Sequence, residues 1–210
     1  MKIEIEHVSK KIKDALVLDD VCMTLESGNI YGFQGVNGSG KTMLMRAVSG
    51  LMYPTSGTIS IDGKVLGKNM AFPEKIGMLI ENPAFIDSYT GYDNLKMLAS
   101  INKGEVDISM ALETVGLNPH DKRKYRKYSL GMRQRLGIAQ VLMEDPDFIL
   151  LDEPMNGLDN EGVVQMRELF IKLKQQGKTF LVVSHNRDDI EALCDEVYEM
   201  DAGMLKKLKK

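Results

Sequence analysis

The segment from Gly35 to Thr42 has the residue types and spacing of a loop that binds phosphate groups. Its glycines let the chain wrap around a polyphosphate with backbone N–H groups pointing inward, and the start of a following helix adds free amides and a positive dipole end. Lys41 is expected to reach the β and γ phosphates, and the Thr42 hydroxyl to bind Mg²⁺. A glycine-rich turn that binds nothing is the alternative. The predicted nucleotide-binding residues here are Gly35, Asn37, Gly38, Ser39, Gly40, Lys41, Thr42 and Met43.

Two carboxylates follow an apolar segment at residues 148–151. Ligands of open α/β sheets bind beyond the carboxyl ends of the strands, so Asp152 and Glu153 are expected at that edge. Asp152 is suited to holding Mg²⁺ through its water shell, and Glu153 to orienting and deprotonating an attacking water. The alternative is that both acids only begin a helical turn. His185 follows another apolar segment, 180–183, and is expected at the same edge.

A third candidate anion site begins near residue 129. Ser129 has the position of a helix N-cap, and Gly131 lies in the first turn of that helix. Backbone amides at such a helix start are able to bind an anion. Taken alone, a plain capped helix with a solvated basic face is the simpler interpretation.

Residue patterns predict the elements that carry these side chains. The first 65 residues favour strands at 3–8 and 17–25 and a hairpin at 57–65, whereas helical periodicity dominates residues 88–145. Elsewhere strand and helix alternate, which is typical of a mostly parallel sheet with helices on both faces. Further strands are expected at 76–80, 147–151 and 179–183, helices at 42–48, 93–101, 108–115, 130–143, 161–175 and 188–193, and a last hairpin around 202–203.

Composition narrows the class of protein. The chain has 210 residues, of which 43% are hydrophobic, and a net charge of −3, which gives no general attraction to nucleic acid. No apolar run approaches the length of a membrane span, so we expect a cytoplasmic protein. Cys22 and Cys194 match no metal-ligand or redox spacing and are interpreted as buried free thiols, and His7 and His120 as ordinary histidines.

The order of the motifs resembles that of the ATP-binding cassette (ABC) ATPases. The phosphate loop is followed by the helical stretch, a Ser-x-Gly-x-x-Gln-Arg helix start, a strand ending in Asp-Glu-Pro, Gly157-Leu158-Asp159 and Ser184-His185. Within that superfamily, residues 128–139 and Ile80-Glu81-Asn82-Pro83 look like the bacitracin-type and lantibiotic-type exporter subunits.

The resemblance implies an α/β fold built on a P-loop NTPase core. That core has a RecA-like, mostly parallel sheet and an N-terminal antiparallel β subdomain, and an α-helical subdomain is inserted into it. We therefore expect a single ABC ATPase domain over residues 1–210. Its nucleotide-binding core spans 1–87 and 146–210, and the helical insertion spans 88–145.

The resemblance also implies how the site works. Two cassettes, from a homodimer or a paralogue, meet head to tail around two ATP molecules, so that each phosphate loop faces the partner's Ser129 and Gly131. Asp159 is then expected at the dimer seam, with a turn acid as its alternative role, and His185 against the γ-phosphate. The implied ligands are ATP and Mg²⁺, and the implied catalytic residues are Glu153, His185 and Lys41.

Three positions depart from the family pattern. Glu81 replaces a usual glutamine, adds negative charge near Mg²⁺, and is included with Thr42 and Asp152 among the predicted metal residues. Leu130 and Met132 replace a glycine and a glutamine, which leaves Ser129 and Gly131 as the transferable contacts. An aromatic residue that commonly stacks on adenine is missing, and Ile12 is expected to contact the base in its place.

These observations favour an ATP-hydrolysing subunit that couples cassette dimerisation to a separate multi-spanning membrane permease. Export of an antibiotic or peptide is implied by the exporter-subunit resemblance, and the chain is then peripheral on the inner face of the cell membrane through its permease. No nucleic-acid partner is expected. The alternatives are a soluble ABC ATPase without a transport role and a nucleotide-sensing regulatory module.

Overall fold

The larger of two β-sheets forms the centre of the molecule. The computed structural model describes residues 1–81, 83–101 and 105–208, and within them this sheet has strand order β10-β9-β3-β8-β7-β6. Neighbouring strands from β9 to β6 run parallel, and β10 is antiparallel to β9. The strands are β3 (Ile30–Gln34), β6 (Ile76–Leu79), β7 (Phe148–Asp152), β8 (Thr179–Val183), β9 (Glu196–Asp201) and β10 (Met204–Leu208).

The smaller sheet is antiparallel and comes from the first third of the chain. Its order is β2-β1-β4-β5, and its strands are β1 (Lys2–Ile12), β2 (Ala15–Glu26), β4 (Ser56–Ile61) and β5 (Lys64–Val65). Buried Ile3 and Ile5 alternate with more exposed residues, as in a sheet with one face on the core. The predicted antiparallel β subdomain and the hairpin at 57–65 are therefore confirmed.

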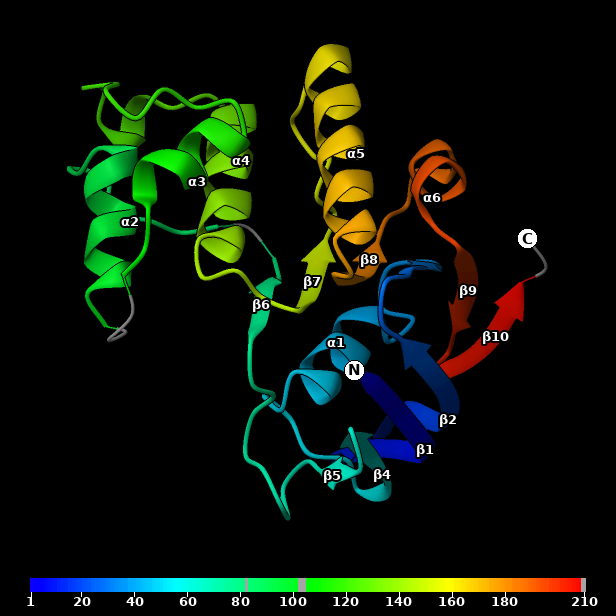
Figure 1. The fold of residues 1–210 in the computed structure, drawn as a ribbon. Helices are drawn as coiled ribbons and strands as arrows, with labels where there is room; N and C mark the ends of the chain where they lie inside the picture. The colour runs from blue at the N-terminus through cyan, green and yellow to red at the C-terminus, as the bar shows by residue number, and fades with distance from the viewer. Residues whose placement is uncertain (82, 102–104, 209–210) are drawn as a thin grey trace.

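Helices cover both faces of the larger sheet, and a group of them lies beyond its β6 edge. Figure 1 shows α2, α3 and α4 together at the left, with α5 and α6 at the top and α1 beside the small sheet. The helices are α1 (Lys41–Val48), α2 (Gly91–Ala99), α3 (Ile108–Thr114), α4 (Leu130–Leu142), α5 (Asn160–Gln175) and α6 (Arg187–Leu193), with a 3₁₀ helix at Tyr125–Lys127.

The mixed α/β fold class and the predicted helices are confirmed. Most of the helix ends differ from the predicted ones by one or two residues. The division of the chain at residues 88 and 145 stays a prediction. In the described part of the chain, none of the helices combines the length and the apolar character that crossing a bilayer requires.

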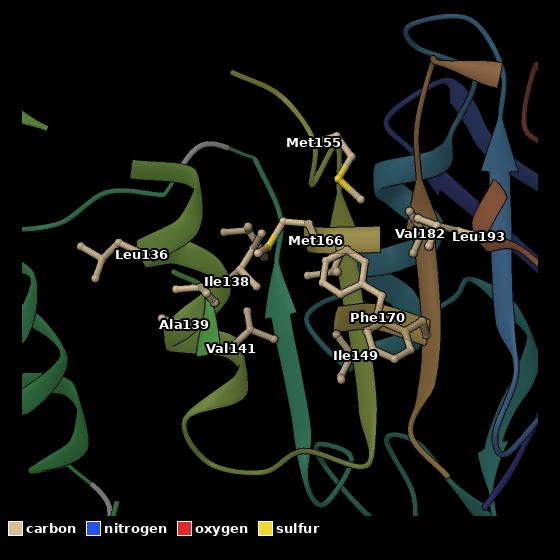
Figure 2. Packing of buried hydrophobic residues seen from close by; sticks show 14 of the residues in the cluster. Leu136, Ile138, Ala139, Val141, Ile149, Met155, Met166, Phe170, Val182 and Leu193 are labelled. Carbon is tan, nitrogen blue, oxygen red and sulfur yellow. The ribbon is translucent and has the colours of Figure 1, made fainter. Parts of the chain in front are cut away.

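Alternate side chains of the central strands enter two different hydrophobic layers. Ile149 and Leu151 of β7 join the layer under α4, α5 and α6, whereas Phe148 and Leu150 face α1 and the small sheet. Figure 2 shows part of the first layer, which includes Ile138 from α4, Ile149 from β7, Phe170 from α5 and Val182 from β8. Both faces of the strand are thus buried, which explains its uninterrupted apolar sequence.

Truncation of Phe170 should strongly destabilise the chain. Its side chain is fully buried and packs on Phe180, with ring centroids 5.4 Å apart. We expect Phe170→Ala to lower the free energy of unfolding by about 3–5 kcal/mol in urea titrations. Ile171→Ala changes the next residue of the same helix, which is 38% exposed, and should cost much less. Equal losses in the two variants would contradict this packing.

Candidate functional site

The phosphate loop connects β3 to α1 and has the conformation that its glycines predict. Gly35 and Gly40 have φ angles of 150° and 112°. A Cβ atom on Gly35 would lie 2.2 Å from the carbonyl oxygen of Met200, and one on Gly40 would lie 2.7 Å from that of Val17. Side chains at these positions would therefore displace the loop from β2 and β9.

Lys41 occupies the centre of this loop. Its Nζ donates hydrogen bonds to the carbonyl oxygens of Gly35, at 2.7 Å, and Val36, at 2.8 Å. Burial lowers the pKa of Lys41, and the carboxylates of Asp152 and Glu153 oppose that shift. The ammonium group is thus held inside the loop by acceptors that an incoming anion is able to replace.

Asp152 lies at the end of β7 beside the first turn of α1. The Thr42 hydroxyl donates to Asp152 Oδ2 over 3.2 Å. Burial raises the pKa of Asp152, and the bond from Thr42 opposes the increase. A hydroxyl and a carboxylate at this separation are hard oxygen ligands, which is the donor set that Mg²⁺ prefers. The predicted metal residues Thr42 and Asp152 are therefore brought together.

Glu153 and His185 form a direct pair. His185 Nδ1 lies 2.8 Å from Glu153 Oε2, and the backbone N–H of His185 donates to Glu153 Oε1 over 3.0 Å. Gln134, from α4, donates to the Glu153 carbonyl over 3.2 Å. Both carboxylate oxygens of Glu153 are thus engaged by His185, and the backbone of Glu153 is connected to the helical group.

A cavity of about 590 Å³ joins most of the predicted site residues. This volume suits a small-molecule ligand. It is lined by Ile12, Asn37, Gly38, Gly40, Lys41, Thr42, Met43, Glu81, Asp152 and Glu153, together with Ala15, Val17, Arg46 and Val183. Gly35 and His185 line a neighbouring cavity of about 800 Å³, which shares Asn37 with the first, and Ser39 is buried within the loop.

Glu81 has a partner that the sequence analysis missed. Its Oε1 atom contacts Nη2 of Arg46, which also lines the cavity. Arg46 follows Thr42 by four residues on α1 and so lies on the same helix face, a spacing that could have identified it. The negative charge of Glu81 is therefore balanced in this structure. Asn82, the next residue of the sequence motif, lies outside the described residues.

Ser129, Gly131 and Asp159 line neither cavity. The Ser129 hydroxyl accepts from the backbone N–H of Met132 and Asp159 accepts from that of Gly162, so the two residues cap α4 and α5. A Cβ atom on Gly131 would lie 2.8 Å from the carbonyl oxygen of Gly157, in the turn before α5. These residues form a second group, which we call the cap cluster, separate from the loop and the carboxylates.

Known proteins match the chain in sequence. The profile of the family described as ABC transporter matches residues 18–156. An uncharacterised ABC transporter ATP-binding protein, YybJ of Bacillus subtilis (strain 168), is 45% identical over 99% of this chain and 96% of its own length. The bacitracin transport ATP-binding protein BcrA of Enterococcus faecalis is 38% identical over 97% of this chain and 67% of its own. The lantibiotic transport ATP-binding protein SrtF of Streptococcus pyogenes is 36% identical, with coverages of 92% and 84%.

Solved structures share the fold. A dimeric ATP-binding cassette in a post-hydrolysis state with ADP and Pi superposes with a TM-score of 0.86, at 23% identity over 99% of both chains. The cbiO1 protein of Clostridium perfringens, part of the transporter complex cbiONQ, gives 0.83 at 26% identity, with coverages of 97% and 86%. The arrangement of both sheets and the helical group is therefore one seen in ATP-binding cassettes.

Because the pKa of Asp152 is raised, we predict that the negative charge of its carboxylate destabilises the folded state. The folded state holds this proton more tightly than the unfolded state, so stability falls as pH rises from about 3.9, the ordinary value, through the raised pKa. Without nucleotide, Asp152→Asn should therefore increase the free energy of unfolding at pH 7 but not at pH 3, as measured in urea. Asp14→Asn, in an exposed turn, is the control. A less stable Asp152→Asn chain at pH 7 would contradict the expectation.

Proposed function

Because this chain belongs to the ABC transporter family and is an ATP-binding ATPase subunit, we propose that ATP binds in the cavity between Ile12, the phosphate loop and Asp152. The lining supports this placement, since it combines Lys41 and the start of α1, which suit phosphate groups, with apolar Ile12, which suits a base. The oxygens of the triphosphate then replace the Gly35 and Val36 carbonyl oxygens as the acceptors of hydrogen bonds from the Lys41 ammonium group.

Thr42 and Asp152 would hold Mg²⁺, which supplies positive charge that balances the phosphate oxygens. The hydroxyl and carboxylate that now bond to each other would turn their oxygens to the ion. Glu81 lines the same cavity and would contact the Mg²⁺ ion through the water molecules bound to that ion. Ionised Asp152 is favoured by that positive charge, which offsets the effect of its burial.

Glu153 acts as the general base for hydrolysis. Its carboxylate takes a proton from water while the water oxygen attacks the γ-phosphorus, and the bond from that phosphorus to the bridging oxygen breaks to give ADP and phosphate. His185 contacts both carboxylate oxygens of Glu153 in this structure. Its imidazole has to turn toward the γ-phosphate for Glu153 to accept the proton.

The cap cluster completes the site of a second cassette. Ser129, Gly131 and Asp159 lie outside their own chain's cavity, which supports a role toward another molecule. The N-terminal amides of α4 would then meet the γ-phosphate held by the partner's phosphate loop. ATP would join two cassettes in this arrangement, as a homodimer or with a paralogue, and its hydrolysis would loosen them.

A multi-spanning membrane permease is the second partner. The names of the relatives support transport, since one serves bacitracin transport and another lantibiotic transport. We extend this to export of a peptide antibiotic, with the chain at the inner face of the cell membrane through the permease. Nucleic acid has no place in this scheme.

Glu153→Gln tests the general base. The amide keeps the size of the side chain but accepts no proton, so ATP hydrolysis should fall by about 10²–10⁴-fold while ATP binding persists. Phosphate release measures the first effect, and size-exclusion chromatography with ATP should show a dimer. Glu168→Gln, exposed on α5, is the control. Hydrolysis at the unchanged rate in Glu153→Gln would exclude this role.

The Arg46–Glu81 pair tests whether Glu81 assists Mg²⁺ binding. Glu81→Gln removes the charge and should raise the Mg²⁺ concentration for half-maximal hydrolysis by up to about fivefold. Arg46→Gln frees the carboxylate and should lower it. Lys64→Gln, which removes a surface pair with Glu74, is the matched control. Shifts in the same direction for the Arg46 and Glu81 variants would contradict the assignment.

A further inference from the structure

Three side chains with metal-binding donors gather on the outer face of the small sheet. They are His7 on β1 and Asp20 and Cys22 on β2, and all three are exposed. The sequence interpretation of Cys22 as a buried thiol is wrong, because its neighbours Val21 and Met23 take the core positions and leave it on the opposite face. None of the three lines the nucleotide cavity.

We propose that His7, Asp20 and Cys22 form a binding site for one zinc-class transition-metal ion. Their potential ligand atoms all lie within 4.8 Å of one another. An imidazole nitrogen, a carboxylate oxygen and a thiolate are three donor types that Zn²⁺ binds, and borderline-soft ions of this kind are preferred over Mg²⁺ by thiolate and imidazole. The fourth position of the tetrahedron is open to water.

The local backbone explains why these residues meet. Where β1 and β2 pair, two consecutive residues of β1, one of which is His7, lie opposite the single residue Cys22 of β2. Two consecutive residues of β2, one of which is Asp20, likewise lie opposite the single residue Ser9 of β1. These are two β-bulges on opposite strands, and bulges redirect side chains. His7 and Asp20 both have positive φ, at 50° and 49°, as residues outside regular pairing do.

Further contacts fix both bulges. The backbone N–H of Asp20 donates to Ser9 Oγ over 3.0 Å, and that of His7 lies 3.2 Å from Cys22 Sγ. Gly57 of β4 passes so close that a Cβ atom on it would lie 2.2 Å from the His7 carbonyl oxygen. Backbone contacts therefore set the spacing of the three donors, rather than a chance meeting of long side chains.

Two of the three donor–donor distances suit a tetrahedral ion after a small adjustment. Bonds of about 2.3 Å to sulfur and 2.0–2.1 Å to nitrogen place these atoms about 3.6 Å apart at a tetrahedral angle. His7 Nδ1 and Cys22 Sγ are 3.6 Å apart. His7 Nδ1 and Asp20 Oδ1 are hydrogen-bonded at 2.8 Å and would separate to about 3.4 Å, which an exposed Asp side chain permits.

Proton balance follows from the donor set. A metal ligand has to be deprotonated at the atom that binds, so His7 binds through the lone pair of a ring nitrogen and Asp20 through its carboxylate. Cys22 binds as thiolate and releases its proton to solvent. Binding therefore releases a proton, and the affinity should increase with pH.

Titration with Co²⁺ and Zn²⁺ tests the site on the whole chain without nucleotide. Co²⁺ should give a thiolate charge-transfer absorption band at one equivalent, and Zn²⁺ should displace it. Cys22→Ser should abolish the band, and His7→Ala and Asp20→Asn should each weaken binding at least tenfold. His120→Ala changes an exposed histidine elsewhere and should leave binding unchanged. A band that survives in Cys22→Ser would overturn the proposal.

Alkylation of the unaltered chain gives a second measurement that does not depend on the folding of any variant. Iodoacetamide should modify exposed Cys22 in the metal-free protein, and one equivalent of Zn²⁺ should slow that reaction at least tenfold, as read by peptide mass spectrometry. An unchanged rate with Zn²⁺ would mean that His7 and Asp20 form an ordinary surface pair, and the proposal would fail.

Discussion

The register of three parallel strands is the constraint on which the site depends. Phe33 of β3 pairs with Val183 of β8, and Val183 pairs with Asp152 of β7, so the three strands end at one level. The phosphate loop, Glu153 and His185 follow directly and meet at that edge. Slipping one strand by a single residue would turn its side chains to the other face and separate Asp152 from Thr42. The two hydrophobic layers prevent such a slip, because each receives alternate residues of the same strands.

Polar groups of the site satisfy one another in the structure. Loop carbonyls hold Lys41, Thr42 holds Asp152, and His185 holds Glu153. Arg46 in turn balances Glu81. A nucleotide at the proposed site would have to replace these contacts with better ones, since a buried polar group without a partner costs about 1–3 kcal/mol. Affinity then depends on differences between two sets of hydrogen bonds, which disfavours ligands that lack the full set of phosphate oxygens.

Local patterns predicted much of the fold and the separate parts of the site. The uninterrupted apolar segments of β7 and β8 and the Ser129 cap were readable because each depends on neighbouring residues. The full length of β1 was not, since its bulges interrupt the alternation of residues. An ion pair such as that of Arg46 with Glu81 depends on how distant segments pack. Helical spacing indicates that Arg46 lies on the same face as Thr42, but it does not indicate that Glu81 is its partner. The exposure of Cys22 follows from simple alternation with buried Val21 and Met23, whereas its meeting with His7 and Asp20 depends on two bulges that local patterns do not reveal.

The cap cluster is connected by direct contacts to the segment that follows β7. Gly131, in the first turn of α4, packs directly on the Gly157 carbonyl, with no room for a Cβ atom between them. One turn further along the same helix, Gln134 bonds to the Glu153 carbonyl. The start of α4 is therefore tied to both ends of the segment from Glu153 to Gly157. A displacement of this helix start therefore reaches the backbone of both Glu153 and Gly157 unless these contacts break.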